Sequence, residues 1–221
     1  MVVLATKIYV AGDARERAQR SLDALVRNTI GELEVEWEIG IRHDDFPTVT
    51  ITGADAAVAR AALREEWGEI TAERSPDAVA IGTLESWNDR GWVLDAGTDV
   101  LIPAAELPLG PGSPAQLIER FGLVQHQRIR FIDDETPRLA DEQVDELYDW
   151  RRGAGRLNVN SVTRGEVRAT LNRAGHAQDI VTIERLGLLE QSVICTDDTD
   201  PPGLLAAVGQ YLPGEMRCVV S

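Results

Sequence analysis

The stretch GWVLDAGTDVLIP, residues 91–103, places two short apolar runs on either side of a turn rich in Asp and Gly. Apolar runs of four or five residues that are separated by such turns are typical of short β-strands. Similar runs lie on both sides, at 78–85 and at 128–132. Because strands this short follow one another so closely, the segment 75–137 predicts a small β-barrel.

The segment before the barrel has a different pattern. A β-rich run at 7–11 is followed by apolar residues at helical spacing over 13–30, and Gly31 ends this predicted helix. Apolar and polar residues then alternate in two runs between 35 and 51, which predicts two half-buried strands, and a second helix follows. This order of elements predicts a small two-layer α+β unit over residues 1–74.

The segment 138–221 again predicts an α+β unit, preceded by an acidic helix. After that helix the predicted order is strand, helix, strand, strand, helix, strand, with Thr163 and Asp200 as helix caps. The run at 156–162 has two possible places, because it could be the first strand of this unit or a late fifth strand of the barrel.

Three motifs in the central segment resemble the S1 RNA-binding module. They are GTLE at 82–85, GWVLDAG at 91–97 and VLIPAAEL at 100–107, in the order in which that module carries them. The resemblance implies a five-stranded OB-type barrel and, as partner, single-stranded or ribosomal RNA. Pro103 stands where that family usually carries an RNA-facing histidine.

The order of α+β unit, S1-like barrel and α+β unit resembles a family of small archaeal proteins described only as a domain of unknown function, and that resemblance implies no activity. The expected fold class is therefore α+β, with a central S1/OB-like barrel flanked by two units of ferredoxin-like or KH-like type. The expected domains are 1–74, 75–137 and 138–221.

The charge balance indicates adaptation to high salt. The chain has 37 Asp and Glu against 22 Lys and Arg, a net charge of −15, and Lys7 is its only lysine. Excess carboxylates keep a protein soluble in molar salt, and guanidinium groups are weakly hydrated. This composition is typical of a halophilic, haloarchaeal-type cytoplasmic protein. Since no run of 18 apolar residues occurs, no membrane partner is expected.

Two groups of residues are candidates for RNA binding. On the predicted barrel, aromatic side chains would stack on bases while arginines contact phosphates. That group is Trp87, Arg90, Trp92, Arg128 and Arg130. The second group follows an acidic tract at 133–149 and belongs to a stretch with six arginines and one acid over 151–176. It contains Arg151, Arg152, Arg156, Arg164 and Arg168.

Each group has a structural alternative. Trp92 could belong to the core of the barrel, with Trp87 covering one end. The arginines of the second group could pair with the acidic tract, because adjacent blocks of opposite charge commonly neutralise each other. A buried Trp92 together with paired arginines would leave an adaptor as the only credible function.

No catalytic residue, cofactor or metal is expected. Cys195 and Cys218 each lie in an apolar run, Cys195 has no basic neighbour, and no nucleophile motif occurs. The sequence hypothesis is an RNA-binding protein without catalytic activity, linked to translation or RNA metabolism. One alternative is a protein–protein adaptor on a ribosome or polymerase. Another is a metal-dependent hydrolase that uses Asp197, Asp198 and Asp200, although Asp200 is also an ordinary helix cap.

Overall fold

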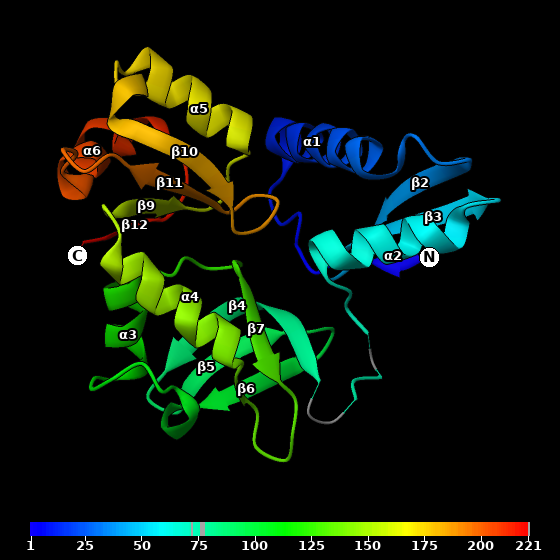
Figure 1. Ribbon diagram of the computed structural model, residues 1–221, viewed down its shortest axis with the longest axis horizontal. Coiled ribbons are helices and arrows are strands. Elements are labelled where there is room, and N and C mark those ends of the chain that lie inside the picture. The colour runs from blue at the N-terminus through cyan, green and yellow to red at the C-terminus, as the bar shows by residue number, and fades with distance from the viewer. Residues whose placement is uncertain (72, 76–77, 221) are drawn as a thin grey trace.

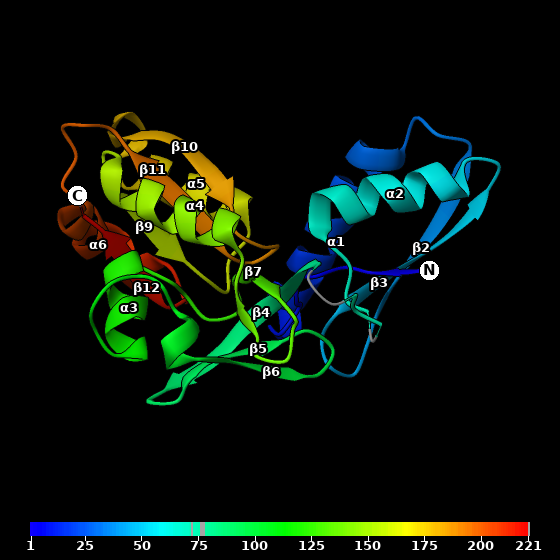
Figure 2. The same cartoon turned by 60° about the horizontal axis from the view of Figure 1, so that its bottom comes forward.

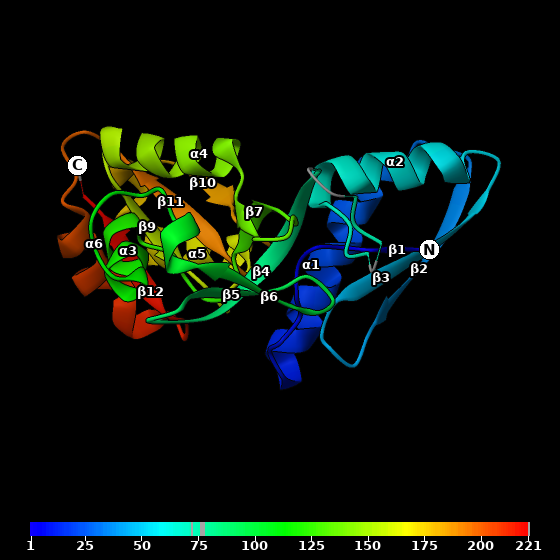
Figure 3. The ribbon, with the colours of Figure 1, turned by 90° about the horizontal axis from the view of Figure 1, so that it is seen from below.

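The computed structural model describes residues 1–71, 73–75 and 78–220, and these residues form three antiparallel sheets with helices packed on them (Figure 1). The N-terminal unit lies to one side of the other two units, as Figures 2 and 3 show. The fold class is therefore α+β. In the described part of the chain, no helix is long and apolar enough to span a membrane.

The N-terminal unit packs two helices on a three-stranded sheet of order β1-β3-β2. Its elements are β1 (Val2–Val3), α1 (Gly12–Ile30), β2 (Val35–Ile41), β3 (Pro47–Gly53) and α2 (Ala56–Trp67). The apolar spacing predicted α1, and its buried face of Ala18, Leu22, Val26 and Ile30 confirms it. The strand predicted at 7–11 is wrong. Residues 7–11 pair with no strand, and β1 lies earlier because Val2 and Val3 pair with β3.

The central unit is a curled sheet of five strands in the order β6-β5-β4-β7-β8. Its elements are β4 (Val79–Asn88), β5 (Gly91–Asp95), β6 (Asp99–Pro103), α3 (Pro114–Phe121), β7 (Arg128–Ile132), β8 (Arg138–Leu139) and α4 (Asp141–Arg152). The described strands β6 and β8 form its two edges and do not pair, so the sheet is a half-barrel. The acidic helix α4 buries Leu147 and Trp150 in the core of this sheet.

The C-terminal unit is a four-stranded sheet of order β10-β11-β9-β12, with two helices that share its core. Its elements are β9 (Arg156–Val159), α5 (Arg164–Arg173), β10 (Ile180–Arg185), β11 (Gln191–Cys195), α6 (Pro201–Val208) and β12 (Met216–Val219). The predicted element order is confirmed. The alternative in which the run at 156–162 closes the barrel is wrong, because β9 pairs with β11 and β12 while β8 supplies the fifth strand of the central sheet.

Candidate functional site

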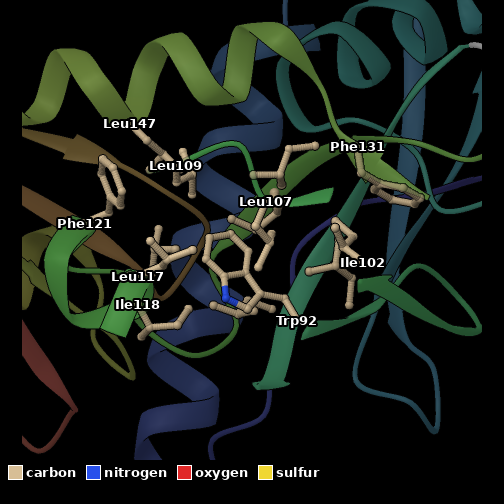
Figure 4. Close-up of a cluster of buried hydrophobic side chains, with 14 of the residues drawn as sticks. Trp92, Ile102, Leu107, Leu109, Leu117, Ile118, Phe121, Phe131 and Leu147 are labelled. Carbon is tan, nitrogen blue, oxygen red and sulfur yellow. The ribbon is translucent and has the colours of Figure 1, made fainter. Parts of the chain in front are cut away.

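Trp92 lies in the core of the central unit. Its relative exposure is 0%, and its indole N–H donates a hydrogen bond of 3.1 Å to the carbonyl of Pro114. Ile102 from β6 and Leu117 from α3 pack around the ring (Figure 4). A base cannot stack on this indole without unfolding the core, so Trp92 is a structural residue in this fold.

The other residues of the predicted barrel surface have different neighbours, and only Arg128 and Arg130 line a common cavity. Trp87 is half-buried, and the guanidinium of Arg217 lies 5.5 Å from its ring centroid. Arg90 is exposed in the β4–β5 hairpin. Arg130 forms an ion pair of 2.9 Å with Glu146 of α4. The Trp87 ring is therefore partly covered by Arg217, and Arg130 is paired with Glu146, so neither is a free group for a single strand.

The second predicted group divides between paired and unpaired arginines. Arg152 pairs with Asp149 at 3.0 Å, and Arg156 pairs with Glu184 at 3.4 Å while lying over the ring of Trp150. Arg151 donates to the carbonyl of Arg120. Arg164 and Arg168 are exposed on α5, and among the described residues no carboxylate lies within 4.0 Å of either. The tract at 133–149 therefore neutralises only part of this group.

Arginines of the central and C-terminal units converge beside the end of α2, where α2, β7 and β10 meet. Two adjoining cavities of about 160 and 400 Å³ share Glu66, Arg128 and Arg185 in their lining, and Arg130 lines the smaller one. Arg164 lines the larger cavity. We call these two cavities the arginine groove. Four glutamates also line it: Glu65, Glu66, Glu146 and Glu184.

Arg128 occupies the centre of the arginine groove and is held by main-chain carbonyls. Its Nε donates to Leu186 at 3.2 Å, and its Nη1 donates to Glu66 at 3.1 Å. Its guanidinium also lies 5.7 Å from the ring centroid of Trp67. Among the described residues Arg128 forms no ion pair, and burial lowers its pKa. The fold therefore fixes one guanidinium without giving it a carboxylate.

Arg185 was not identifiable from the sequence as part of a site. It follows an ordinary strand pattern, and its partner Glu66 is 119 positions away in the chain, at 3.2 Å in space. Its guanidinium lies 5.6 Å from the Trp67 ring, which it shares with Arg128. Only the contact between the first and last units reveals this pair.

A buried polar network joins the N-terminal unit to the central one. Lys7 forms ion pairs with Glu85 at 2.9 Å and with Asp95 at 2.8 Å. Burial opposes ionisation of Glu85, but hydrogen bonds involving His126, Thr83 and Lys7 outweigh it and lower its pKa to about 2. Burial likewise opposes the charge on Lys7, yet its bonds to the two carboxylates raise its pKa.

The same network continues to the C-terminal unit through Tyr9 and Glu190. The Tyr9 hydroxyl donates to Glu190 Oε1 at 2.7 Å and accepts from the Ser161 N–H at 2.9 Å. The ring of His126 packs against that of Tyr9, with centroids 3.9 Å apart. Burial raises the pKa of Glu190 to about 8. These groups hold one another rather than facing a common open space, so we assign the network a structural role.

The acidic cluster near the last helix is a helix cap. Asp200 Oδ2 accepts from the N–H of Gly203 at 2.9 Å, and Pro201 occupies the first turn. Within the described residues, no group of three or more His, Cys, Asp or Glu side chains could hold a metal ion.

Models of a single protein family match almost the whole chain. The DUF2110 N-terminal domain matches residues 1–73, the DUF2110 central domain matches 74–151, and the DUF2110 C-terminal domain matches 154–220. The central match includes α4, in agreement with the packing of that helix on the central sheet. No curated protein matches the chain.

Proposed function

We propose that this chain, which belongs to the DUF2110 family, is a non-catalytic protein–protein adaptor that binds an extended segment of its partner along strand β2. The observation that carries the proposal is the free edge of the N-terminal sheet. β2 pairs with β3 over all seven residues, and among the described residues no strand pairs with its other side. Such an edge is a template for an added strand.

The orientation of β2 suits strand addition. Pro47 lies opposite Ile41 and has no N–H, so these two residues form a pair without mutual hydrogen bonds. Along an antiparallel ladder such pairs alternate with hydrogen-bonded pairs. Every second residue of β2 therefore directs its N–H and C=O away from β3. These residues are Val35, Trp37, Ile39 and Ile41, and all four side chains are half-exposed. A partner strand could therefore form main-chain hydrogen bonds with the same four residues whose apolar side chains it would contact.

The chemistry of the partner follows from the opposite face of β2. Glu36 and Glu38 are exposed there, between the half-buried apolar residues. Like charges directly opposite one another destabilise a strand pair, which disfavours pairing of β2 with a second copy of itself. We therefore expect a partner segment that alternates apolar residues with Lys or Arg. A ribosomal or polymerase protein, the partner class named by the sequence hypothesis, is compatible with this chemistry.

The central unit supports an adaptor more than an RNA-binding protein. The RNA hypothesis required Trp92 on the outside, and the indole is fully buried. We further propose that the central sheet is an S1/OB-type unit without an RNA-binding face. The order β12-β9-β11-β10 supports a ferredoxin-like relationship for the C-terminal unit. The only candidates left for RNA contact are exposed arginines that form no ion pair among the described residues, such as Arg164 and Arg168 on α5.

The test is binding of a synthetic seven-residue peptide that alternates Ile and Arg, measured by calorimetry at 0.2 and 2 M KCl. Ile39→Pro removes an outward N–H that the sheet of the protein itself does not use, so we expect loss of binding without unfolding. Ile39→Ala keeps the N–H and should only weaken binding. Val181→Ala, at an exposed residue of edge strand β10, is the matched control.

Equal peptide binding by the wild type and by folded Ile39→Pro would exclude β2 as the docking edge. Filter binding of single-stranded RNA in molar KCl separates the two function classes. Retention of RNA that is lost in Arg164→Gln with Arg168→Gln, together with no peptide binding, would replace the adaptor by an RNA-binding protein.

A further inference from the structure

Four arginines and four glutamates line the arginine groove, so the charges of its lining balance although the protein as a whole carries −15. Arg128, Arg130 and Arg185 lie close enough that Arg130 and Arg185 each lower the pKa of Arg128, after the larger effect of its burial. Arg130 and Arg185 each have one glutamate partner, Glu146 and Glu66. Arg128 and Arg164 form no ion pair among the described residues, so two guanidiniums around one groove lack a counter-charge.

The fold holds the Arg128 side chain in place but does not use all of its hydrogen-bond donors. Main-chain carbonyls accept from its Nε and Nη1, whereas no described atom accepts from Nη2. Trp67, on which Arg128 and Arg185 lie, is 2% exposed and its indole nitrogen has no hydrogen-bond partner. The half-buried Arg128 therefore keeps Nη2 free to bind a ligand, and Trp67 Nε1 is a buried donor without an acceptor, which destabilises a protein.

The nearest buried carboxyl group does not supply the missing charge. The charge of Glu190 attracts Arg128, but burial raises the pKa of Glu190 to about 8 and its Oε1 already accepts from Tyr9. At neutral pH this group is largely protonated. An anion bound in the groove would give Arg128 the direct ion pair that no described carboxylate forms with it.

We propose that the arginine groove binds the phosphate group of a ligand through Arg128, Arg164 and Arg185. A guanidinium presents two parallel N–H donors that match two oxygens of a phosphate, and several guanidiniums around one cavity reproduce the usual composition of phosphate sites. The larger cavity, about 400 Å³, has the size of a small-ligand site. Glu66 and Glu184 line the same cavity and repel an anion, so a bound phosphate would have to be held by the arginines.

The phosphate could belong to a free nucleotide or to the end of an RNA strand, because both present the same terminal group. The groove joins residues of α2, β7 and β10, so a bound phosphate would also connect the three units. This site is separate from the β2 edge, and the variants that test one leave the other unchanged.

The experiment titrates the intact protein with pyrophosphate, with ADP and with a 5′-phosphorylated RNA 12-mer, at constant KCl and neutral pH. Thermal shift and calorimetry measure binding. Arg164→Gln changes an exposed residue at the start of α5 that lines the groove. Arg168→Gln, one turn further along α5 and equally free of ion pairs, is the matched control because it does not line the groove.

We expect pyrophosphate to raise the melting temperature, Arg164→Gln to weaken binding at least about tenfold, and Arg168→Gln to leave it unchanged. Arg128→Gln should abolish binding. Stronger binding of the 5′-phosphorylated RNA than of a 5′-hydroxyl RNA, with ADP inactive, identifies an RNA end as the source. Stronger binding of ADP identifies a nucleotide. Absence of any binding, or equal losses in Arg164→Gln and Arg168→Gln, overturns the groove site.

Discussion

The indole N–H of Trp92 donates to the carbonyl of Pro114, the first residue of α3, at a distance of 3.1 Å. This bond anchors a helix to the curled sheet across a loop that begins after β6. Trp92 thus contributes apolar area and one satisfied donor to the same core. The residue with the strongest resemblance to a base-stacking position therefore holds the central unit together.

Replacement of Trp92 should reduce stability rather than binding. We expect Trp92→Ala to lower the free energy of unfolding by about 3–5 kcal/mol, because it leaves a large cavity and an unpaired carbonyl. Trp92→Phe keeps most of the ring and should be milder. Denaturant unfolding measures both. A stable, folded Trp92→Ala protein would show that the indole is not part of the core.

Lys7, the only lysine, should be irreplaceable by arginine. It lies between two carboxylates at 2.8 and 2.9 Å with a relative exposure of 7%, where the larger planar guanidinium does not fit without displacing a neighbour. Lys7→Met should destabilise the protein by about 3 kcal/mol, because it leaves Glu85 and Asp95 without the cation that they share. Arg152→Met, in an exposed pair, is the comparison and should change stability little. Equal effects of the two methionine variants would contradict this prediction.

Glu190 should make the protein less stable as the pH rises. Its pKa is about 8 in the folded chain, against an ordinary value of 4.5. The unfolded chain ionises first, so stability falls between about pH 4.5 and pH 8 and the loss is complete above pH 8. Glu190→Gln cannot ionise. Its advantage over the wild type should be absent near pH 4 and reach a few kcal/mol above pH 8.

Glu85 provides the opposite control. Its folded pKa of about 2 lies below 4.5, so its stabilising contribution is present above pH 4.5 and is lost as the pH falls toward 2. Glu85→Gln should therefore cost most at neutral pH. Unfolding measured from pH 2 to 9 for both variants separates the two groups. If stability depended on pH in the same way in both variants, the raised pKa of Glu190 and the lowered pKa of Glu85 would be contradicted.

Potassium chloride should stabilise the fold. The net charge of −15 repels itself at low ionic strength, and exposed ion pairs such as Arg152–Asp149 contribute little against it. We expect the melting temperature to rise between 0.1 and 2 M KCl. An uncharged osmolyte at equal osmolality serves as the control. A flat or falling curve would contradict the salt-adapted interpretation.

Local sequence signals predicted most of the helices. Strand pairing depends on contacts between distant residues, which the sequence pattern does not show. Thr163 and Glu166 form the capping box expected at the start of α5, and Asp200 caps α6 as expected. The helix α3 is not among the predicted elements, although Ser113 and Gln116 form a capping box there. The strand β9 had two possible places in the sequence, because local pattern does not decide which sheet a strand joins.

The candidate site shows the same limit. Arg128 and Arg164 were identifiable as cations in unusual places, but their common groove depends on Trp67 and Arg185, which no local pattern connects. Trp92 fits a surface and a core equally well in the sequence, and only the position of α3 decides between them.

The junction of Tyr9 with Glu190 has a consequence for synthesis on the ribosome. Tyr9 and Glu190 are 181 positions apart in the chain. Thr6 and Leu188, which are also hydrogen-bonded, are 182 positions apart. Residues 6–9 must therefore wait for residues 188–190 before these contacts can form. Until residues 186–190 are translated, the nascent N-terminal unit exposes a surface that is buried in the finished protein, and a chaperone would find its substrate there.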